Sequence, residues 1–462
     1  MLQYQNVIPM QNIAVIGTGI SGMSAAWLLS HSCNVTVYEK DDRIGGHSNT
    51  VSIGEDHIDT GFIVYNEPNY PNLTALFSHL GVETAETDMS FAVSLGGKLE
   101  YAGHGLDGLF AQRRNVFNAR FLTMVYDLLR FYRQASDLDL AGLQKQTLGD
   151  YLRQNGYSDA FIYDHLLPMG AAIWSTPVGK MLDYPLASFL RFCQNHGLIR
   201  LKGRPQWRTV CRGSQAYVDK LTATYKKNIR LNCAVDKIKR YESHVEIIDR
   251  QGQSNRYDQI IIATHADQAL KLLASPSRAE EEILGAFSYS RNLAILHSDP
   301  ALMPKNKRAW ASWNYLSQES GETQADDSKV SVTYWMNRLQ HIPSARPYFV
   351  TLNPIEMPAE GSIYRSFLYD HPVFDTGALA AQKNIWGMQG KQRTWYCGSY
   401  LGYGFHEDGL QSGLAVAEKV GAVKRPWAVE QQNGRIDLPE DWGALAKIEP
   451  GQAVVKERLK HG

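Results

Sequence analysis

The chain has 462 residues with 44% hydrophobic content, and its basic and acidic residues balance at 47 each. Zero net charge argues against a nucleic-acid-binding protein, and no apolar run reaches the roughly 18 residues of a membrane-spanning helix. The first residues lack the basic and apolar regions of a signal peptide, and the five cysteines are scattered without a CxxC pair. We therefore expect a cytoplasmic two-domain protein with reduced thiols and no metal site.

The segment from residue 12 to residue 40 predicts a dinucleotide site. A β-branched run at 13–16 breaks into Gly17-Thr18-Gly19-Ile20-Ser21-Gly22, then a helix-like segment and a second apolar run follow. The three glycines permit a tight turn, close approach of a pyrophosphate and close helix packing, and the helix amides face the phosphate charge. An acid at the end of the second run can bind ribose hydroxyls. The residues predicted here to bind the cofactor are Gly17, Gly19, Ile20, Ser21, Gly22, Glu39 and Lys40.

A second segment, Gly103 to Gly108, also fits GxGxxG, but its context differs. Residues 98–102 do not read as a buried parallel strand, and the helical pattern that follows leads to no second strand and acid. We interpret this segment as a glycine-rich loop. No separate nicotinamide site is therefore expected.

The residues after the first motif indicate which dinucleotide binds. Residues 43–50, RIGGHSNT, resemble the RxGGRxxT segment of the flavin amine oxidase and phytoene desaturase superfamily. In that family the two glycines bring the chain against the pyrophosphate of FAD. His47 replaces an arginine; it can donate a hydrogen bond to phosphate but lacks a permanent charge, and the alternative is a solvent-facing loop histidine. The resemblance implies FAD and adds Gly45, Gly46, His47 and Ser48 to the site.

The C-terminal part carries a matching motif. Residues 393–405 predict a strand running into a glycine turn, and 406–418 predict a helix with acids in its first turn, where the helix dipole favours them. This resembles the C-terminal flavin motif of the same superfamily, in which helix amides face the flavin ring and stabilise negative charge on it. Ser399-Tyr400 stand where amine oxidases usually have a glutamate. The resemblance implies roles for Gly398, Asp408, Gly409 and Leu410.

Cys397 precedes this glycine turn and raises the question of a covalent flavin. It lies inside the predicted strand. A link from there to the flavin is not expected, so we predict that FAD is bound non-covalently.

Motifs at both ends require a discontinuous cofactor domain. We expect an α/β protein in which a Rossmann-like FAD-binding domain is interrupted by an inserted α+β substrate domain, as in two-domain amine oxidase-like flavoproteins. The FAD-binding domain takes 10–70, 204–270 and 386–425, the substrate domain takes 71–203 (mostly helical) and 271–385 (mostly β), and 426–462 form a polar tail.

Several elements inside these boundaries follow from local patterns. Helices are predicted at 71–80 and over much of 106–197, and a hairpin at 91–101. A strand is predicted at 229–236, with Val235 beside the adenine, and a buried parallel strand at 260–264. Further β-like runs lie at 293–296, 330–336 and 348–352.

Residues 113–133 form a basic amphipathic segment with five arginines and one aspartate. Such a helix can lie in a membrane interface, which would place the protein peripherally on the inner membrane face. The alternative is an ordinary helix that packs on the core. The apolar residues at helical spacing are Phe117, Phe121, Met124, Val125, Leu128 and Tyr132.

Four short sequence segments extend the resemblance over nearly the whole chain: residues 58–66, 332–337, 371–374 and 402–409. They are similar to a clade of bacterial proteins described as NAD/FAD-binding, related to flavin-dependent fatty acid isomerases and to a desaturase of methylated acyl chains. The resemblance implies an FAD-dependent oxidoreductase that abstracts hydride from an activated C–H bond, with desaturation or isomerisation of a fatty acyl or lipid chain.

Two alternatives stay open at this point. One is an FAD-dependent amine oxidase, for which Tyr400 and Tyr403 could form an aromatic cage. The other is a non-catalytic flavin-binding module. No catalytic residue is singled out, although four polar residues in the family-like phrases could face the flavin: Tyr65, Tyr334, His371 and His406.

Overall fold

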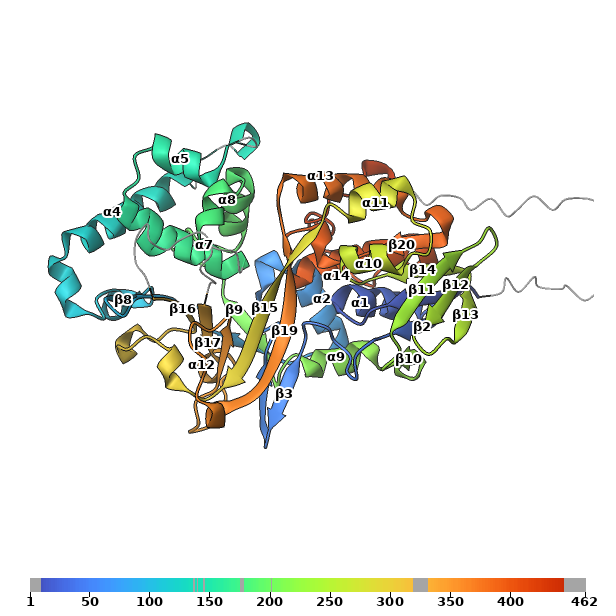
Figure 1. The fold of residues 1–462 in the computed structure, drawn as a ribbon, viewed down its shortest axis with the longest axis horizontal. Helices are drawn as coiled ribbons and strands as arrows, with labels where there is room; N and C mark the ends of the chain where they lie inside the picture. The colour runs from blue at the N-terminus through green and yellow to red at the C-terminus, as the bar shows by residue number, and fades with distance from the viewer. Residues whose placement is uncertain are drawn as a thin grey trace, which may run out of the picture.

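The computed structural model describes residues 10–135, 138, 140–143, 146–174, 178–200, 202–318 and 331–443. A five-stranded parallel sheet forms the centre of the FAD-binding domain (Figure 1). Its strands come from three separate stretches of chain, so the domain is discontinuous. In spatial order they are β10 (Ile229–Arg230), β2 (Asn34–Tyr38), β1 (Asn12–Ile16), β14 (Gln259–Ile262) and β20 (Thr394–Tyr396).

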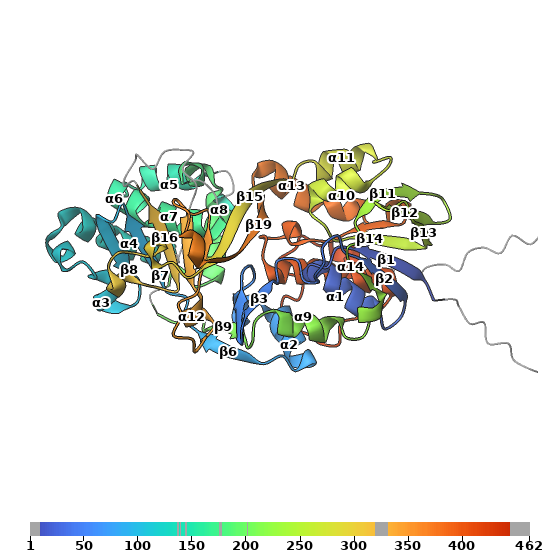
Figure 2. The same cartoon turned by 60° about the horizontal axis from the view of Figure 1, so that its bottom comes forward.

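Both faces of this sheet are covered (Figures 1 and 2). One face carries α1 (Ile20–Leu29), α2 (Pro71–Leu80), α9 (Gln215–Thr222) and α14 (His406–Gly421). Glycines let α14 approach α1 closely: a Cβ on Gly413 would lie 2.3 Å from the Ser21 carbonyl oxygen. The other face carries α10 (Ala266–Leu272), α11 (Arg278–Leu284) and the antiparallel strands β11 (Val235–Arg240), β12 (Val245–Asp249) and β13 (Ser254–Tyr257).

The substrate domain is built on a seven-stranded sheet, antiparallel except where β16 pairs with β7. Its two longest strands, β15 and β19, run from the FAD-binding domain into this sheet (Figure 1). The order is β19 (Ile363–Val373), β15 (Ser288–His297), β18 (Phe349–Leu352), β17 (Ser331–Trp335), β16 (Trp313–Ser317), β7 (Phe91–Leu95) and β8 (Leu99–Ala102). The inserted helices include α4 (Ala119–Ala135), α5 (Leu148–Gln154), α6 (Asp159–Phe161), α7 (Leu167–Trp174) and α8 (Leu186–Asn195).

Shorter elements complete the structure. A hairpin, β3 (Thr50–Ile53) with β4 (Asp56–Asp59), follows the glycine-rich segment, and β5 (Val64–Asn66), β9 (Trp207–Val210) and β6 (Thr84–Thr87) form a small antiparallel sheet. The remaining α-helices described are α3 (Gly105–Leu109), α12 (Met336–Leu339) and α13 (Thr376–Asn384). Within the described residues, no helix is both long and apolar enough to cross a bilayer.

The predicted α/β fold class is confirmed, and so are the helix at 71–80, the hairpin at 91–101 and the buried parallel strand near 260. The single strand predicted at 229–236 is wrong. Asn232 has a left-handed φ of 53°, and the amides of residues 232 and 233 bond to carbonyls of residues 41 and 39, so the chain leaves the parallel sheet after two residues. Val235 instead begins β11 of another sheet.

The C-terminal tail packs on the core rather than standing apart. Trp427 stacks on Trp27 with ring centroids 5.8 Å apart, and Ile436 is buried. The part of the predicted tail at 444–462 and the first residue of the strand predicted at 330–336 lie outside the described residues. The domain boundaries themselves stay predictions.

Candidate functional site

A cavity of about 770 Å³ lies between the two domains. Its floor is made by residues that directly follow the parallel strands, among them Gly17 after β1, Glu39 after β2 and Ala263 after β14. The carboxyl edge of a parallel sheet is where such folds bind cofactors. The opposite wall comes from the substrate-domain sheet, including Trp313 and Tyr334.

The glycines of the first turn have two different roles: two pack against the protein backbone, and one faces the cavity. Gly17 has a φ of 102°, and a Cβ there would lie 3.0 Å from the Ala263 carbonyl oxygen. Gly22 packs against the turn, since its Cβ would lie 2.0 Å from the Gly17 oxygen. Gly19, in contrast, lines the cavity and has open space where a side chain would begin. Ile20 and Ser21 also line the cavity, and the helix that they begin has no side-chain cap, which leaves its N-terminal dipole for a bound anion.

The second glycine turn lies directly against the first. Gly46 has a φ of 58°, and its Cβ would be 3.0 Å from the Gly19 Cα. Gly45, with a φ of 125°, turns toward the Ser48 carbonyl and does not line the cavity. Arg43 braces this turn by donating to the Gly46 carbonyl at 2.7 Å and to the Ser48 carbonyl at 3.3 Å. Arg43 also lines the cavity and brings a permanent positive charge, although our predicted site omitted it; its place in the RxGG spacing was the available signal.

Beside the glycine turns, backbone amides fix the Glu39 carboxylate in a position to bind the ribose of the cofactor. One carboxylate oxygen accepts from the Thr18 amide at 3.0 Å, and the other accepts from the Asp41 amide at 3.0 Å. Val235 lines the cavity at this end, and Lys40 is exposed at its rim. The structure therefore brings these predicted residues together with the glycine turns.

His47 lies on the cavity wall within an aromatic and histidine-rich group, not in a solvent-facing loop. Its ring centroid is 4.9 Å from that of Tyr369 and 5.7 Å from that of His371. Burial, followed by the proximity of His371 and His265, lowers the pKa of His47 well below its usual value. Its Nε2 is buried and lacks a protein partner among the described residues, which suits a bound group such as phosphate.

Two further histidines on the wall are fixed by their neighbours. His371 Nδ1 accepts from the Asn292 amide nitrogen at 3.1 Å, and burial lowers the pKa of His371 to about 4. His406 stacks on Phe62 with centroids 3.8 Å apart, and burial lowers its pKa to about 3. The Nε2 atom of His406 lies 2.9 Å from the hydroxyl of Ser48, which is itself buried beneath the wall. Tyr334 lines the cavity and Tyr65 does not.

After His406, which lies on the cavity wall, the first turn of α14 is tied to the C-terminal tail. Asp408 accepts from the Phe405 amide at 2.7 Å and forms a 2.7 Å ion pair with Arg435, while burial raises its pKa to about 6. Gly409 faces α1, and Leu410 is fully buried in the core. Of the predicted C-terminal residues, only Gly398 lines the cavity.

Three nearby side chains bear on the predicted non-covalent binding of FAD and on the alternative of an aromatic cage. Cys397 is fully buried in the core and is not on the cavity wall, and burial raises its pKa. Tyr400 and Tyr403 both line the cavity, but their rings pack on different neighbours. The Tyr400 ring meets Phe287 at 4.8 Å, whereas the Arg435 guanidinium lies 5.5 Å from the Tyr403 ring.

The part of the cavity away from the glycine turns is lined mainly by apolar and aromatic side chains. Its walls come from α7, α8 and strands β16 to β19 of the substrate domain. No residue from 113–133 lines it. Among the lining residues, the acids are Glu39 and Asp41 at the ribose end and Asp370, which pairs with Arg291 at 3.0 Å. The apolar residues include Met89, Ala172, Ile173, Phe192, Leu198, Trp313, Val350, Leu352 and Leu368.

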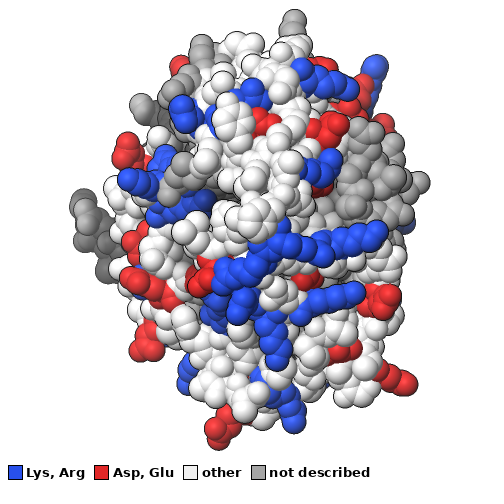
Figure 3. All heavy atoms as spheres, turned by 90° about the vertical axis from the view of Figure 1, so that its left-hand side faces the viewer, with Lys and Arg blue, Asp and Glu red and all other residues white. Residues whose placement is uncertain are grey.

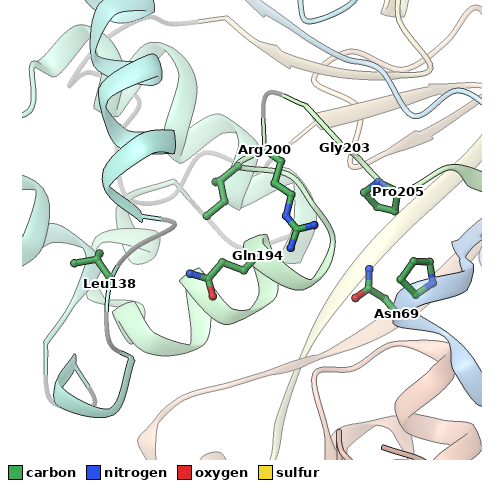
Figure 4. Close-up of a pocket in the computed structure, with 8 residues that line it drawn as sticks. Asn69, Leu138, Gln194, Arg200, Gly203 and Pro205 are labelled. Carbon is green, nitrogen blue, oxygen red and sulfur yellow. The ribbon is translucent and has the colours of Figure 1, made fainter. Parts of the chain in front are cut away.

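A second hollow of about 530 Å³ lies beside α8 and outside the main cavity. Figure 4 shows the Arg200 and Gln194 side chains pointing into it, with Asn69 and Pro205 across from them. Its lining residues come from both domains. No sequence motif indicated this hollow.

A family model described as flavin containing amine oxidoreductase matches residues 20–338. Flavin-containing amine oxidase A from Sus scrofa is 40% identical over 83 residues, which span 18% of this chain and only 16% of that protein.

Two solved structures show the same fold. Putrescine oxidase bound to putrescine has a TM-score of 0.64 at 15% identity, covering 90% of this chain and 99% of that one. The CLA-producing fatty acid isomerase from P. acnes has a TM-score of 0.61 at 14% identity, covering 89% and 98%. The match of the family model over most of the chain, together with the paired glycine turns, confirms the flavin resemblance. The chain therefore belongs to the flavin-containing amine oxidoreductase family and is an FAD-dependent oxidoreductase.

Proposed function

We propose that this enzyme abstracts a hydride from an activated C–H bond of a fatty acyl or lipid chain, with desaturation or isomerisation as the outcome. The observation that carries the proposal is the apolar end of the cavity, where the lining residues include no unpaired carboxylate. Burying an acyl chain there yields about 0.8 kcal/mol per methylene, so an apolar wall supplies affinity without charged ligands.

The walls also suit hydride chemistry away from water. FAD, when bound, supplies the acceptor for the hydride. The neutral state of His371 follows from its lowered pKa, and its hydrogen bond from Asn292 fixes Nδ1 as an acceptor and leaves the proton on Nε2. Burial raises the pKa of Tyr334, so His371 and Tyr334 are both uncharged polar groups that can orient a substrate without attracting an ammonium ion.

Amine oxidation is the second candidate, and the similarity to amine oxidase A and to putrescine oxidase favours it. A protonated amine buried in an apolar cavity requires a counter-charge. Asp370 is the acid at the substrate-domain wall, and Arg291 already neutralises it. The different packing of Tyr400 and Tyr403 also gives less support to a cage formed by the two rings.

Anaerobic flavin reduction separates the two candidates. We expect unsaturated or methyl-branched acyl lipids to bleach the oxidised flavin band, and we expect primary amines and polyamines to leave it unchanged. Reduction by amines, with no response to a broad panel of acyl lipids, would establish the amine oxidase instead.

A substitution at the apolar end sharpens this test. Leu352 lines the cavity near the end of β18 and is 8% exposed. Leu352→Asp places a carboxylate where the acyl chain would lie, so we expect reduction by acyl lipids to weaken at least about tenfold. Leu352→Met keeps an apolar side chain of similar size and serves as the matched control, with flavin content checked in both variants. Faster reduction by amines in Leu352→Asp, with unchanged reduction by lipids, would contradict the proposal.

A further inference from the structure

Large apolar side chains are exposed in an unusual concentration at the outer end of the helical insertion. Half of the large hydrophobic residues that are exposed in the described chain lie between residues 106 and 129. Phe117 is the most exposed of them at 90%, and Leu106 follows at 74%. The full group, called here the apolar edge, is Leu106, Val116, Phe117, Leu122, Tyr126 and Leu129.

Helix α4 contributes to this edge because it is apolar on two sides. Phe121, Met124 and Phe131 are buried in the core of the insertion, as expected for a packing helix. Leu122, Tyr126 and Leu129 lie at i, i+4 and i+7 and form a separate row that faces outward, 41% to 67% exposed. A solvated helix face normally carries polar residues, so this row indicates a contact surface.

A group of basic residues borders the apolar edge. Figure 3 looks onto this end of the molecule and shows Lys and Arg side chains gathered in a band across it. Contacts join the members: Arg114 donates to the Lys98 carbonyl at 2.6 Å, and the Lys305 side chain lies against Gly97. The full group, called here the basic border, is Lys98, Arg113, Arg114, Lys305, Lys307 and Arg308.

Among the described residues, acidic groups offset only part of the charge of the basic border. Asp107 pairs with Arg113 at 2.7 Å. Glu100 is buried and accepts from the backbone amides of residues 305 and 306, so its carboxylate points inward. Counted over the described residues, the border therefore keeps a positive charge beside the apolar edge.

We propose that this end of the molecule docks on an anionic lipid bilayer, with the apolar edge entering the interface and the basic border on lipid phosphates. Aromatic and aliphatic side chains next to Lys and Arg are the combination that binds such an interface. A second copy of the chain would instead bring two basic borders together. The proposal rests on surface residues outside the cavity and does not depend on the acyl-lipid substrate.

The full FAD-loaded chain can be tested by co-sedimentation with vesicles. We expect binding to vesicles of phosphatidylcholine with phosphatidylglycerol, little binding to pure phosphatidylcholine, and weaker binding as salt screens the charges. The triple variant Phe117→Ser, Leu122→Ser, Tyr126→Ser and the double variant Arg113→Gln, Arg114→Gln should each lose at least about tenfold in affinity for the anionic vesicles. Tyr241→Ser with Met357→Ser, at exposed positions elsewhere, is the matched control and should bind as the unmodified chain does.

Flavin content and melting temperature show whether each variant is folded, and a second readout is local. Phe117→Cys carrying an environment-sensitive fluorophore should shift to the blue on addition of anionic vesicles. No binding of the unmodified chain at low salt, or equal binding by the triple variant, would overturn the proposal. A dimer that the triple variant dissociates, without vesicle binding, would also overturn it and assign the edge to a second copy.

Discussion

Gly19 is the glycine whose side-chain position opens into the cofactor cavity. Gly19→Val should therefore fold but lose FAD, because its methyl groups would occupy the space into which the pyrophosphate fits. We expect at least a tenfold lower FAD affinity, about 1.4 kcal/mol or more. The flavin absorbance per polypeptide after purification measures this.

Substitutions at two other glycines are controls for the Gly19→Val result. Gly361 also has open space at its Cβ position, but it is exposed on the surface and does not line the cavity, so Gly361→Val should retain FAD. Gly22→Val should reduce folding rather than FAD binding alone, because its Cβ would collide with the Gly17 carbonyl. Full flavin occupancy in Gly19→Val would show that the phosphates lie elsewhere.

His371 should make the fold sensitive to acid. Its pKa falls from 6.5 to about 4 on burial, so between these values the unfolded chain binds a proton that the folded chain does not. The free energy of unfolding therefore falls as pH drops from about 6.5 to about 4, by up to about 3 kcal/mol for this one group. His371→Asn keeps an acceptor for the Asn292 amide and should flatten the dependence by roughly one proton.

Urea unfolding at a series of pH values measures that slope. His57 lies half-buried on the β3–β4 hairpin and outside the cavity, so His57→Gln is the matched histidine substitution with which the slope of His371→Asn is compared. An unaltered slope in His371→Asn would mean that His371 does not titrate in the assumed environment.

Single residues differ in how far the sequence reveals their role. The glycine spacing and Glu39 identify the cofactor turn because a backbone turn and an adjacent acid are local requirements. Asp408 was placed at the flavin because its position in the chain fits a first-turn acid. Its partner Arg435 lies 27 residues further along, and no local pattern reveals that pairing.

Helices and strands also divide into those that local sequence determines and those that tertiary contacts determine. The helix at 71–80 has the predicted bounds because Pro71 opens it and Gly81, with a left-handed φ of 62°, ends it. The strand predicted at 229–236 failed because tertiary hydrogen bonds to the loop after β2 turn the chain at Asn232. The row of exposed apolar residues on α4 escaped notice because periodicity shows which residues share a face, and not which face meets the core.

The junction between α14 and the C-terminal tail yields a stability prediction. Asp408 is fully buried and pairs with Arg435, which also lies near the Tyr70 and Tyr403 rings. Arg435→Ala leaves a buried acid without its partner and should lower the free energy of unfolding by about 3 kcal/mol or more. Denaturation in urea, followed by flavin release and circular dichroism, measures the loss.

Removing the charge from both partners tests the cause. Asp408→Asn with Arg435→Met should recover part of the stability that Arg435→Ala loses. Arg278→Ala breaks an exposed ion pair at 2.7 Å on α11 and should have no measurable effect. If Arg435→Ala were as stable as the unmodified chain, the tail would not hold the start of α14.

The arrangement of the two domains determines which parts of the chain line each end of the cavity. The glycine turns come from residues within 17–46, so this part of the cofactor end can be predicted from one local stretch, although Val235 and Gly398 join it from other parts of the chain. The apolar end combines residues from α7, α8, β16, β17 and β18, which only the folded chain brings together. The local pattern could therefore predict a dinucleotide site, and the family resemblance of residues 43–50 and 393–418 implied FAD, whereas the substrate end required the tertiary structure.

This arrangement also predicts where the electrons come from. The second GxGxxG segment, Gly103 to Gly108, lies after β8 and overlaps the short helix α3, and none of its residues lines the cavity. Since β8 is at one end of an otherwise mostly antiparallel sheet, this segment lacks the parallel strand–turn–helix context that binds a nicotinamide dinucleotide. Anaerobic mixing with NADH or NADPH should therefore leave the oxidised flavin band essentially unbleached, while dithionite in the same cuvette reduces it fully. Rapid bleaching by micromolar nicotinamide would reveal a second dinucleotide site, and loss of that bleaching in Gly105→Val would place it at this loop.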